Sequence, residues 1–142
     1  MKETLEILLV DDNPADCDLV CDVLAQGKHP AHVSTAADGE EAMAFLQHQG
    51  KFTGAAAPDL VMLDLNLPRK DGRTVLAEVR ASAALRKLPV VIFTTSQARP
   101  DIERSYELGA NCYVTKPGNL QDFVAAIRSI EEFWLGLVCL PN

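Results

Sequence analysis

The stretch VMLDLNLPRKDG at residues 61–72 runs from apolar residues straight into a carboxylate and then into a turn. Its apolar start is typical of a parallel strand that is covered on both faces. Asp64 ends this strand, and Pro68 and Gly72 favour a loop directly behind it. The stretch therefore predicts a buried strand, and it raises the question of what the carboxylate at its end is for.

Similar apolar runs recur along the chain and alternate with helical patterns. The predicted strands cover residues 7–10, 32–36, 60–63, 90–93 and 112–114. The helices are predicted to begin near Asn13, Asp38, Thr74, Pro100 and Asn119, the last one reaching at least Phe133. This alternation predicts an α/β fold, a doubly wound five-stranded parallel sheet with five helices on its two faces.

Length and composition restrict the class of protein. A chain of 142 residues suits one domain with one core. The formal charge of −7 and the lack of a basic stripe argue against a nucleic-acid partner. No apolar run approaches the roughly 18 residues of a membrane span, and the start of the chain does not read as a signal peptide. We therefore expect a cytoplasmic protein without a membrane partner.

The cysteines do not form a metal-binding pattern. They are Cys17, Cys21, Cys112 and Cys139, and the histidines are His29, His32 and His48. No CxxC pair occurs, and the histidines do not stand at zinc-ligand spacing from the cysteines. We expect reduced, mostly buried thiols in a reducing compartment.

Polar side chains follow four of the five predicted strands. Asp11 and Asp12 end the first strand, Asp64 the third, Thr94 the fourth and Lys116 the fifth. In such sheets the site lies beyond the carboxyl ends of the strands, so these side chains should converge. Loops are often polar, but five residues of these types are better explained by a site that binds a cation and a phosphoryl group. The pattern favours phosphoryl transfer onto a carboxylate.

These residues resemble the receiver domain of two-component response regulators. The resemblance rests on the acidic pair DD at residues 11–12, on Asp64 within LDLNLPRKDG, on Thr94 after PVVIF, and on the pair Lys116–Pro117, and it covers about residues 5–130. It implies the flavodoxin-like strand order 2-1-3-4-5. Residues 1–142 would form a single receiver domain, with a core of about 5–130 and a C-terminal extension of about 131–142.

The resemblance assigns roles to the acidic residues. Asp64 would accept the phosphoryl group from the phosphohistidine of a sensor histidine kinase. Asp12, Asp64 and the backbone carbonyl of Asn66 would bind Mg²⁺ directly, and Asp11 would act mainly through a metal-bound water. Mn²⁺ or Ca²⁺ could replace Mg²⁺ in crystals. The chain would thus be a phosphorylated signalling switch that catalyses only its own phosphorylation and dephosphorylation.

The resemblance also assigns roles around the phosphoacceptor. Lys116 would pair with Asp64 and then with its phosphoryl group, while Thr94 would hydrogen-bond that group. Tyr113 would swing inward as Thr94 moves. The positions that tune the phosphoryl lifetime would be Asn66 and Ser96. The peptide bond between Lys116 and Pro117 is expected to be cis.

Further motifs resemble a subgroup, the small regulators that pair with phytochrome kinases. These motifs are LDLNLP, FTTS, SYELGANCYVTKP and EEFWL. The resemblance implies a homodimer through the fourth helix, the fifth strand, the fifth helix and the C-terminal tail. That surface would carry Tyr106, Glu107, Tyr113 and Gln121. Alternatively, the tail folds back on its own domain. Output would come from protein contacts or from passing the phosphoryl group to a histidine phosphotransfer protein.

Three alternative interpretations of an α/β chain of this kind are less consistent with the residues present. An aspartyl-phosphate phosphatase would need a carboxylate two residues after the nucleophile, where this chain has Asn66. A nucleotide or flavin module would need a phosphate loop after the first strand, where DDNPAD places acids. A receiver that has lost phosphorylation is disfavoured because all five site residues are present.

Overall fold

A single parallel sheet organises the computed structural model, which describes residues 3–142. Its strands are β1 (Leu5–Val10), β2 (Ala31–Ala36), β3 (Leu60–Leu63), β4 (Val90–Thr94) and β5 (Cys112–Thr115). They lie in the order β2-β1-β3-β4-β5, and every neighbouring pair is parallel. The predicted strand order and the five predicted strands are confirmed.

Five α-helices and one 3₁₀ turn connect the strands. The helices are α1 (Pro14–Ala25), α2 (Gly39–Leu46), α3 (Gly72–Ala81), α4 (Arg99–Glu107) and α5 (Leu120–Trp134), and the turn η1 covers Gly50–Phe52. Asn13, Asp38 and Asn119 cap three of the helices through their side chains, as residues of these types do at N-termini. The prediction that Thr74 opens α3 was wrong, because Asp71 accepts from the Arg73 amide and the helix starts at Gly72.

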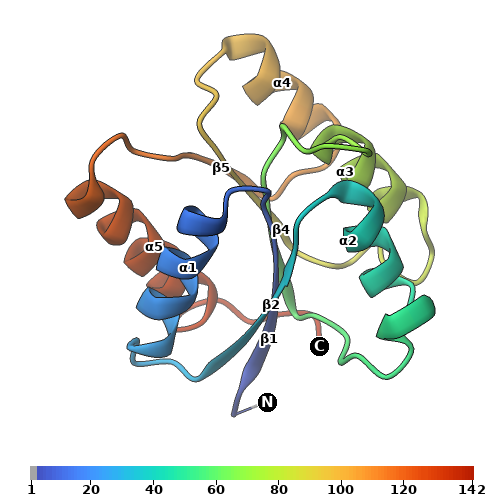
Figure 1. Cartoon of the computed structure of the whole chain (residues 1–142), viewed down its shortest axis with the longest axis horizontal. Coiled ribbons are helices and arrows are strands. Elements are labelled where there is room, and N and C mark those ends of the chain that lie inside the picture. Colours follow the sequence, from blue (N-terminus) through green and yellow to red (C-terminus); the bar gives the residue numbers. More distant parts are fainter. Residues whose placement is uncertain (1–2) are drawn as a thin grey trace.

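The helices cover both faces of the sheet (Figure 1). On one face, α1 and α5 pack over alternate strand residues such as Ile7 and Leu9. On the other face, α2 and α3 pack over Leu8 and Val10, and α4 lies on the same side (Figure 1). Strands that are buried on both faces must be apolar throughout, which is why residues 60–63 lack any polar alternation.

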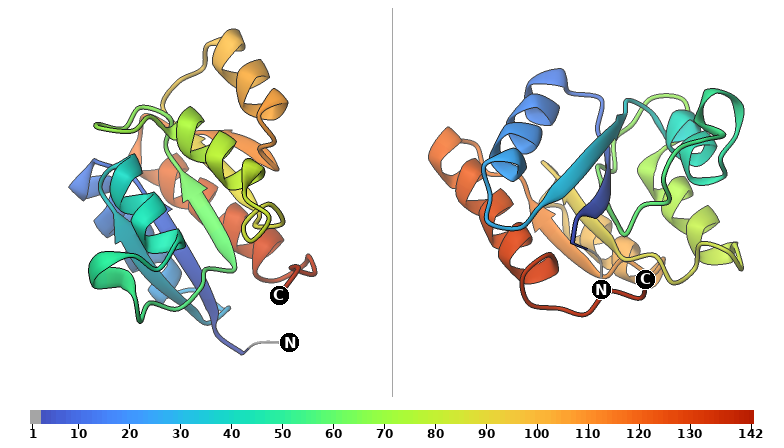
Figure 2. Two further views of the ribbon diagram at one scale, coloured as in Figure 1. Left: turned by 90° about the vertical axis from the view of Figure 1, so that its right-hand side faces the viewer. Right: turned by 90° about the horizontal axis from the view of Figure 1, so that it is seen from below.

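The long loop and the C-terminal tail both lie toward the amino ends of the strands. In the loop at 50–59, Phe52 packs on Phe45 with ring centroids 5.2 Å apart. After α5 the chain crosses beneath the sheet (Figure 2), and the Asn142 amide donates to the carboxylate of Asp59 at 2.7 Å. Asp59 is buried directly before β3 and also accepts from the Glu6 amide at 2.8 Å. The tail therefore contacts its own domain, as in the alternative that the sequence left open.

Two smaller findings concern membrane-spanning helices and the thiols. Among residues 3–142, none of the helices combines the length and apolar character that crossing a bilayer requires. The four cysteines are free, but only three are half-buried and Cys139 is exposed, so the expectation of burial holds in part. Burial raises the pKa of the Cys17 thiol to about 12, so this thiol stays protonated at neutral pH.

The contact between α1 and α5 gives the first prediction. Ile127 has no exposed surface and packs in the apolar cluster between these helices. Ile127→Ala should lower the free energy of unfolding by about 2–5 kcal/mol, through lost burial and the cavity left behind. Urea unfolding measures this, with the exposed neighbour Arg128→Ala as the control, which should stay within about 0.5 kcal/mol. Equal losses in the two variants would contradict the packing described here.

Candidate phosphoacceptor site

Four strands deliver the expected polar side chains to one edge of the sheet. The side chains are Asp11 after β1, Asp64 after β3, Thr94 at the end of β4 and Lys116 after β5. These four residues are 3%, 8%, 0% and 6% exposed, whereas Asp12 is exposed. The site is thus a buried polar group of residues with one carboxylate at its mouth.

The ammonium group of Lys116 is the centre of this group. Its Nζ atom lies 2.6 Å from Asp11 Oδ2, 2.9 Å from Asp16 Oδ2 and 3.0 Å from Asp64 Oδ2. An ammonium has three protons, so all of its donors are used. Burial alone would lower the pKa of Lys116, but the hydrogen bonds to Asp11 and Asp16 outweigh burial and raise the pKa above its usual value. The side chain therefore carries its charge at neutral pH.

Sequence reasoning missed Asp16. From the sequence alone, an acid in the first turn of a helix is expected only to favour the positive end of that helix. In the structure Asp16 lies in the first turn of α1 and reaches across to Lys116. Its position in the sequence could have indicated this contact. The first turn of the helix after β1 lies at the same edge of the sheet as Asp11 and Lys116.

Thr94 and Asp64 are already in direct contact. The Thr94 hydroxyl donates to Asp64 Oδ1 at 2.6 Å, while Asp64 Oδ2 accepts from Lys116. The Asn66 amide lies 3.4 Å from Asp64 Oδ1 at the start of the loop. At the other end of this loop, a Cβ added to Gly72 would lie 2.2 Å from the Asp64 carbonyl oxygen. The loop therefore packs tightly against the Asp64 backbone, which explains why residue 72 is a glycine.

The acids can hold a cation. One carboxylate oxygen each from Asp11, Asp12 and Asp64 lies within 4.8 Å of the others. Burial raises the pKa of Asp11, and the hydrogen bond from Lys116 offsets this only in part. One ammonium does not neutralise the surrounding carboxylates, and oxygen ligands of this kind suit Mg²⁺ or another hard divalent ion. For the Asn66 carbonyl, the contacts among residues 3–142 neither support nor oppose a ligand role, so that part stays a prediction.

Tyr113 lies half-buried between the site and α4. Its hydroxyl donates to the Ser96 carbonyl at 2.9 Å, and its amide donates to the phenolic oxygen of Tyr106 at 3.2 Å. Burial raises the pKa of Tyr113, so the hydroxyl stays a donor at neutral pH. The Ser96 side chain donates to Asp101 on α4. The inward swing expected for Tyr113 stays a prediction.

The prediction of a cis peptide bond between Lys116 and Pro117 was wrong, because the bond is trans. The trans form is the lower-energy default for a bond before proline, by about 0.5–1 kcal/mol. The Lys116 amide donates to the Thr94 carbonyl at 2.7 Å, so β5 stays paired with β4 up to this residue.

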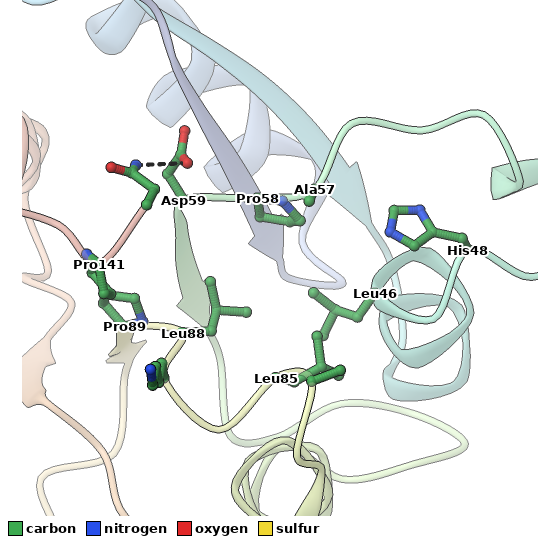
Figure 3. Close-up of a pocket in the computed structure, with 12 residues that line it drawn as sticks. Leu46, His48, Ala57, Pro58, Asp59, Leu85, Leu88, Pro89 and Pro141 are labelled. Carbon is green, nitrogen blue, oxygen red and sulfur yellow. Dashed lines mark hydrogen bonds between the residues drawn. The ribbon is translucent and has the colours of Figure 1, made fainter. Parts of the chain in front are cut away.

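A separate pocket lies at the opposite edge of the sheet (Figure 3). Leu46, Leu85, Leu88 and Pro141 are among the residues that line it, next to Asp59. Asp59 precedes β3 whereas Asp64 follows it, so the whole length of a strand separates the pocket from the acids. The predicted site residues do not line this pocket.

Comparison with known proteins identifies the class. The response regulator receiver domain family matches residues 7–128, and the chain belongs to this family. The class is thus that of the two-component response regulators, as the resemblance predicted.

Individual relatives within this class match nearly the whole chain. The chain is 48% identical over 135 residues to the response regulator Rcp1 of Synechocystis sp., covering 95% of this chain and 92% of that protein. The crystal structure of the Mn²⁺-bound form of Rcp1 matches with a TM-score of 0.94 at 47% identity, over 97% of this chain and 99% of the other. The phosphorylated cyanobacterial phytochrome response regulator RcpA matches with a TM-score of 0.95 at 47% identity, over 98% and 99%.

The tight approach of Gly72 to Asp64 gives the second prediction. Gly72→Ala should force the loop away from the Asp64 carbonyl and lower the free energy of unfolding by about 1–3 kcal/mol, the usual cost of overpacking. Gly54→Ala is the control, because a Cβ there meets nothing within 4 Å. Chemical denaturation of both variants measures the difference. An unchanged free energy of unfolding in Gly72→Ala would mean that the loop does not pack tightly against the Asp64 backbone.

Proposed function

We propose that Asp64 accepts a phosphoryl group from the phosphohistidine of a sensor histidine kinase, with Mg²⁺ bound beside it. The observation that carries the proposal is the contact of the two Asp64 oxygens with Thr94 and with Lys116 at a buried strand end. A nucleophile fixed in this way needs little reorganisation when the phosphoryl donor arrives. The similarity to RcpA, which is described as a cyanobacterial phytochrome response regulator, supports a kinase of the phytochrome type.

The reaction exchanges one phosphorus bond for another. An Asp64 oxygen attacks phosphorus, a bond from oxygen to phosphorus forms, and the bond from the imidazole nitrogen to phosphorus breaks. Lys116 supplies positive charge beside the reacting oxygens, and Thr94 supplies a hydroxyl donor. Mg²⁺, where bound by these residues, would supply positive charge to the carboxylates and the phosphoryl oxygens. Asp11 and Asp12, with the Asn66 carbonyl, are the residues proposed to hold the ion with Asp64.

The phosphoryl group then biases the surface of the domain. It adds about −1.5 to −2 charges and three acceptor oxygens beside Thr94 and Lys116. The arrangement that satisfies these oxygens is favoured over any other, so the group shifts a conformational equilibrium. Tyr113 and Ser96 lie between the site and α4, which supports a readout on α4, β5 and α5. This is the behaviour of a switch rather than of a phosphatase, for which Asn66 offers no acid.

The third prediction tests the acceptor and the metal together. After incubation with acetyl phosphate and Mg²⁺, intact mass spectrometry should detect one added phosphoryl group on the wild type. Asp64→Asn should gain none, because an amide cannot form the acyl phosphate. Removal of Mg²⁺ with a chelator should also abolish the gain, because the carboxylates then repel the donor phosphate.

Asp22→Asn is the matched control for this experiment. Asp22 is exposed on α1 and does not line the pocket that contains Asp11 and Asp12, so the substitution changes the charge equally away from the site. It should be phosphorylated like the wild type. Phosphorylation of Asp64→Asn at the wild-type level would show that another residue is the acceptor. Phosphorylation without a metal would show that the reaction does not need the ion.

We further propose a homodimer through α4, β5, α5 and the tail. Among residues 3–142 the exposed large apolar side chains are Tyr106, Leu120, Phe133 and Leu137, all on α4, α5 or the tail. An apolar groove on the same side is lined by Cys112, Val114, Ala126, Ser129, Ile130, Phe133 and Trp134. Apolar surface gathered on one side usually marks an interface. A two-fold arrangement would bury the same groove on both copies.

The fourth prediction concerns this dimer. Phe133, which is 47% exposed, lines the groove, so Phe133→Glu should place a charge in the interface and yield monomers. Sedimentation velocity at micromolar concentration measures the change. Gln49→Glu adds the same charge after α2, away from the groove, and should remain dimeric like the wild type. A Phe133→Glu protein that still sediments as a dimer would place the interface elsewhere.

A further inference from the structure

A chain of polar contacts connects the loop after Asp64 to helix α4. Arg73, the second residue of α3, donates from Nη1 to Asp71 Oδ1 at 3.0 Å and from Nη2 to Asp101 Oδ1 at 2.6 Å. The other oxygen of Asp101 accepts from the hydroxyl of Ser96. The chain of contacts therefore joins the β3–α3 loop to the β4–α4 loop, and these are the loops that leave the strands of Asp64 and Thr94.

Ser96 is held on several sides at once. Its hydroxyl donates to Asp101 and also accepts from the Ala98 amide at 3.3 Å. Its carbonyl accepts from the Tyr113 hydroxyl at 2.9 Å. A serine hydroxyl has a single proton, so a Ser96 hydroxyl that donates to Asp101 cannot donate to a water molecule at the same time. Both the backbone and the side chain of this loop residue are thereby fixed.

The pair of Arg73 and Asp101 differs from an ordinary surface ion pair. The two side chains are 27% and 28% exposed. Arg99 and Glu103, which lie on α4 like Asp101, are 78% and 57% exposed. The hydrogen bonds from Ser96 and Arg73 hold the pKa of Asp101 below its usual value. Asp101 is therefore ionised at neutral pH. Part-buried pairs are screened less by salt than exposed ones, so this contact is the better candidate for a constraint.

The two bridged loops lie on either side of the phosphoacceptor. Gly72, next to Arg73, packs against the Asp64 carbonyl, and Thr94, two residues before Ser96, donates to the Asp64 carboxylate. We propose that Arg73 and Asp101 are positioning residues that bridge these loops, fix Ser96 and limit the attack of water on an aspartyl phosphate at Asp64. In that hydrolysis, water attacks phosphorus, the bond from phosphorus to the Asp64 oxygen breaks, the carboxylate returns and inorganic phosphate leaves with a proton taken up by solvent.

This inference rests on the proposed phosphorylation of Asp64, and the experiment separates the two. Wild type, Arg73→Gln, Asp101→Ala and the double variant are phosphorylated with acetyl phosphate and Mg²⁺, and the donor is removed. Intact mass then follows the loss of the phosphoryl group with time. The initial phosphorylated fraction tests the proposed function, and the rate constant of loss tests the bridge. Arg99→Gln and Glu103→Ala, which break the exposed pair on the same helix, are the matched controls.

Each single variant should lose the phosphoryl group about three- to tenfold faster than the wild type, and the double variant no faster than the singles, because either change breaks the same contact between Arg73 and Asp101 that joins the two loops. The two controls should stay within about twofold of the wild type. Single variants that match the wild type would overturn the proposal. A double variant whose effect is the product of the singles would also overturn it, because independent effects multiply.

A second measurement needs no phosphorylation. The chain has two tyrosines, so protein labelled with 3-fluorotyrosine gives two fluorine NMR signals, and Tyr113→Phe assigns them. Asp101→Ala should shift the Tyr113 signal, because the Ser96 carbonyl is no longer held in place, and Glu103→Ala should not. An unshifted Tyr113 signal in Asp101→Ala would overturn the positioning of Ser96. A wild type that takes up no phosphoryl group would overturn the proposed function and the effect on lifetime, while the fluorine signals still decide the positioning.

Discussion

The ammonium of Lys116 is the interaction on which the site depends. It lies among three carboxylates that come from the ends of β1 and β3 and from the first turn of α1. Without a positive charge, the carboxylates gathered here would repel one another. With it, the Asp64 carboxylate is held in one orientation by Lys116 and Thr94. The surplus of negative charge that is left after this pairing is what makes the site attractive to a divalent cation.

The position of the site follows from the way the sheet is buried. Helices cover both faces, so polar side chains gather where the strands end. The carboxyl-terminal edge carries the acids, Thr94 and Lys116, while the amino-terminal edge carries the tail and the separate pocket (Figure 3). Asp64, the proposed acceptor, therefore directly follows a buried strand, and the loops after β3 and β4 are the parts proposed to respond to its phosphorylation. This division suits the proposed switch.

Much of this arrangement could be predicted from the sequence because it depends on local patterns. Apolar runs such as residues 60–63 define the strands, and parallel strands bring their carboxyl ends to one edge. What sequence reasoning missed depends on side-chain directions between elements. To predict the contact of Asp16 with Lys116, one must know how α1 is rotated about its axis. To predict the contact of Arg73 with Asp101, one must know how α3 and α4 are placed relative to each other. The start of α3 was misplaced because the role of Asp71 as a cap is visible only once its hydrogen bond to the Arg73 amide is known.

The hydrogen bond from the Tyr113 amide to the Tyr106 hydroxyl has a consequence for how the sheet ends. β5 is an edge strand, and edge strands expose amide groups that can pair with a strand from another chain. Here a phenolic oxygen from α4 already accepts from one of those amides. An incoming strand would have to displace Tyr106 before it could extend the sheet at this point. Sheet extension, and with it aggregation through this edge, is thereby disfavoured.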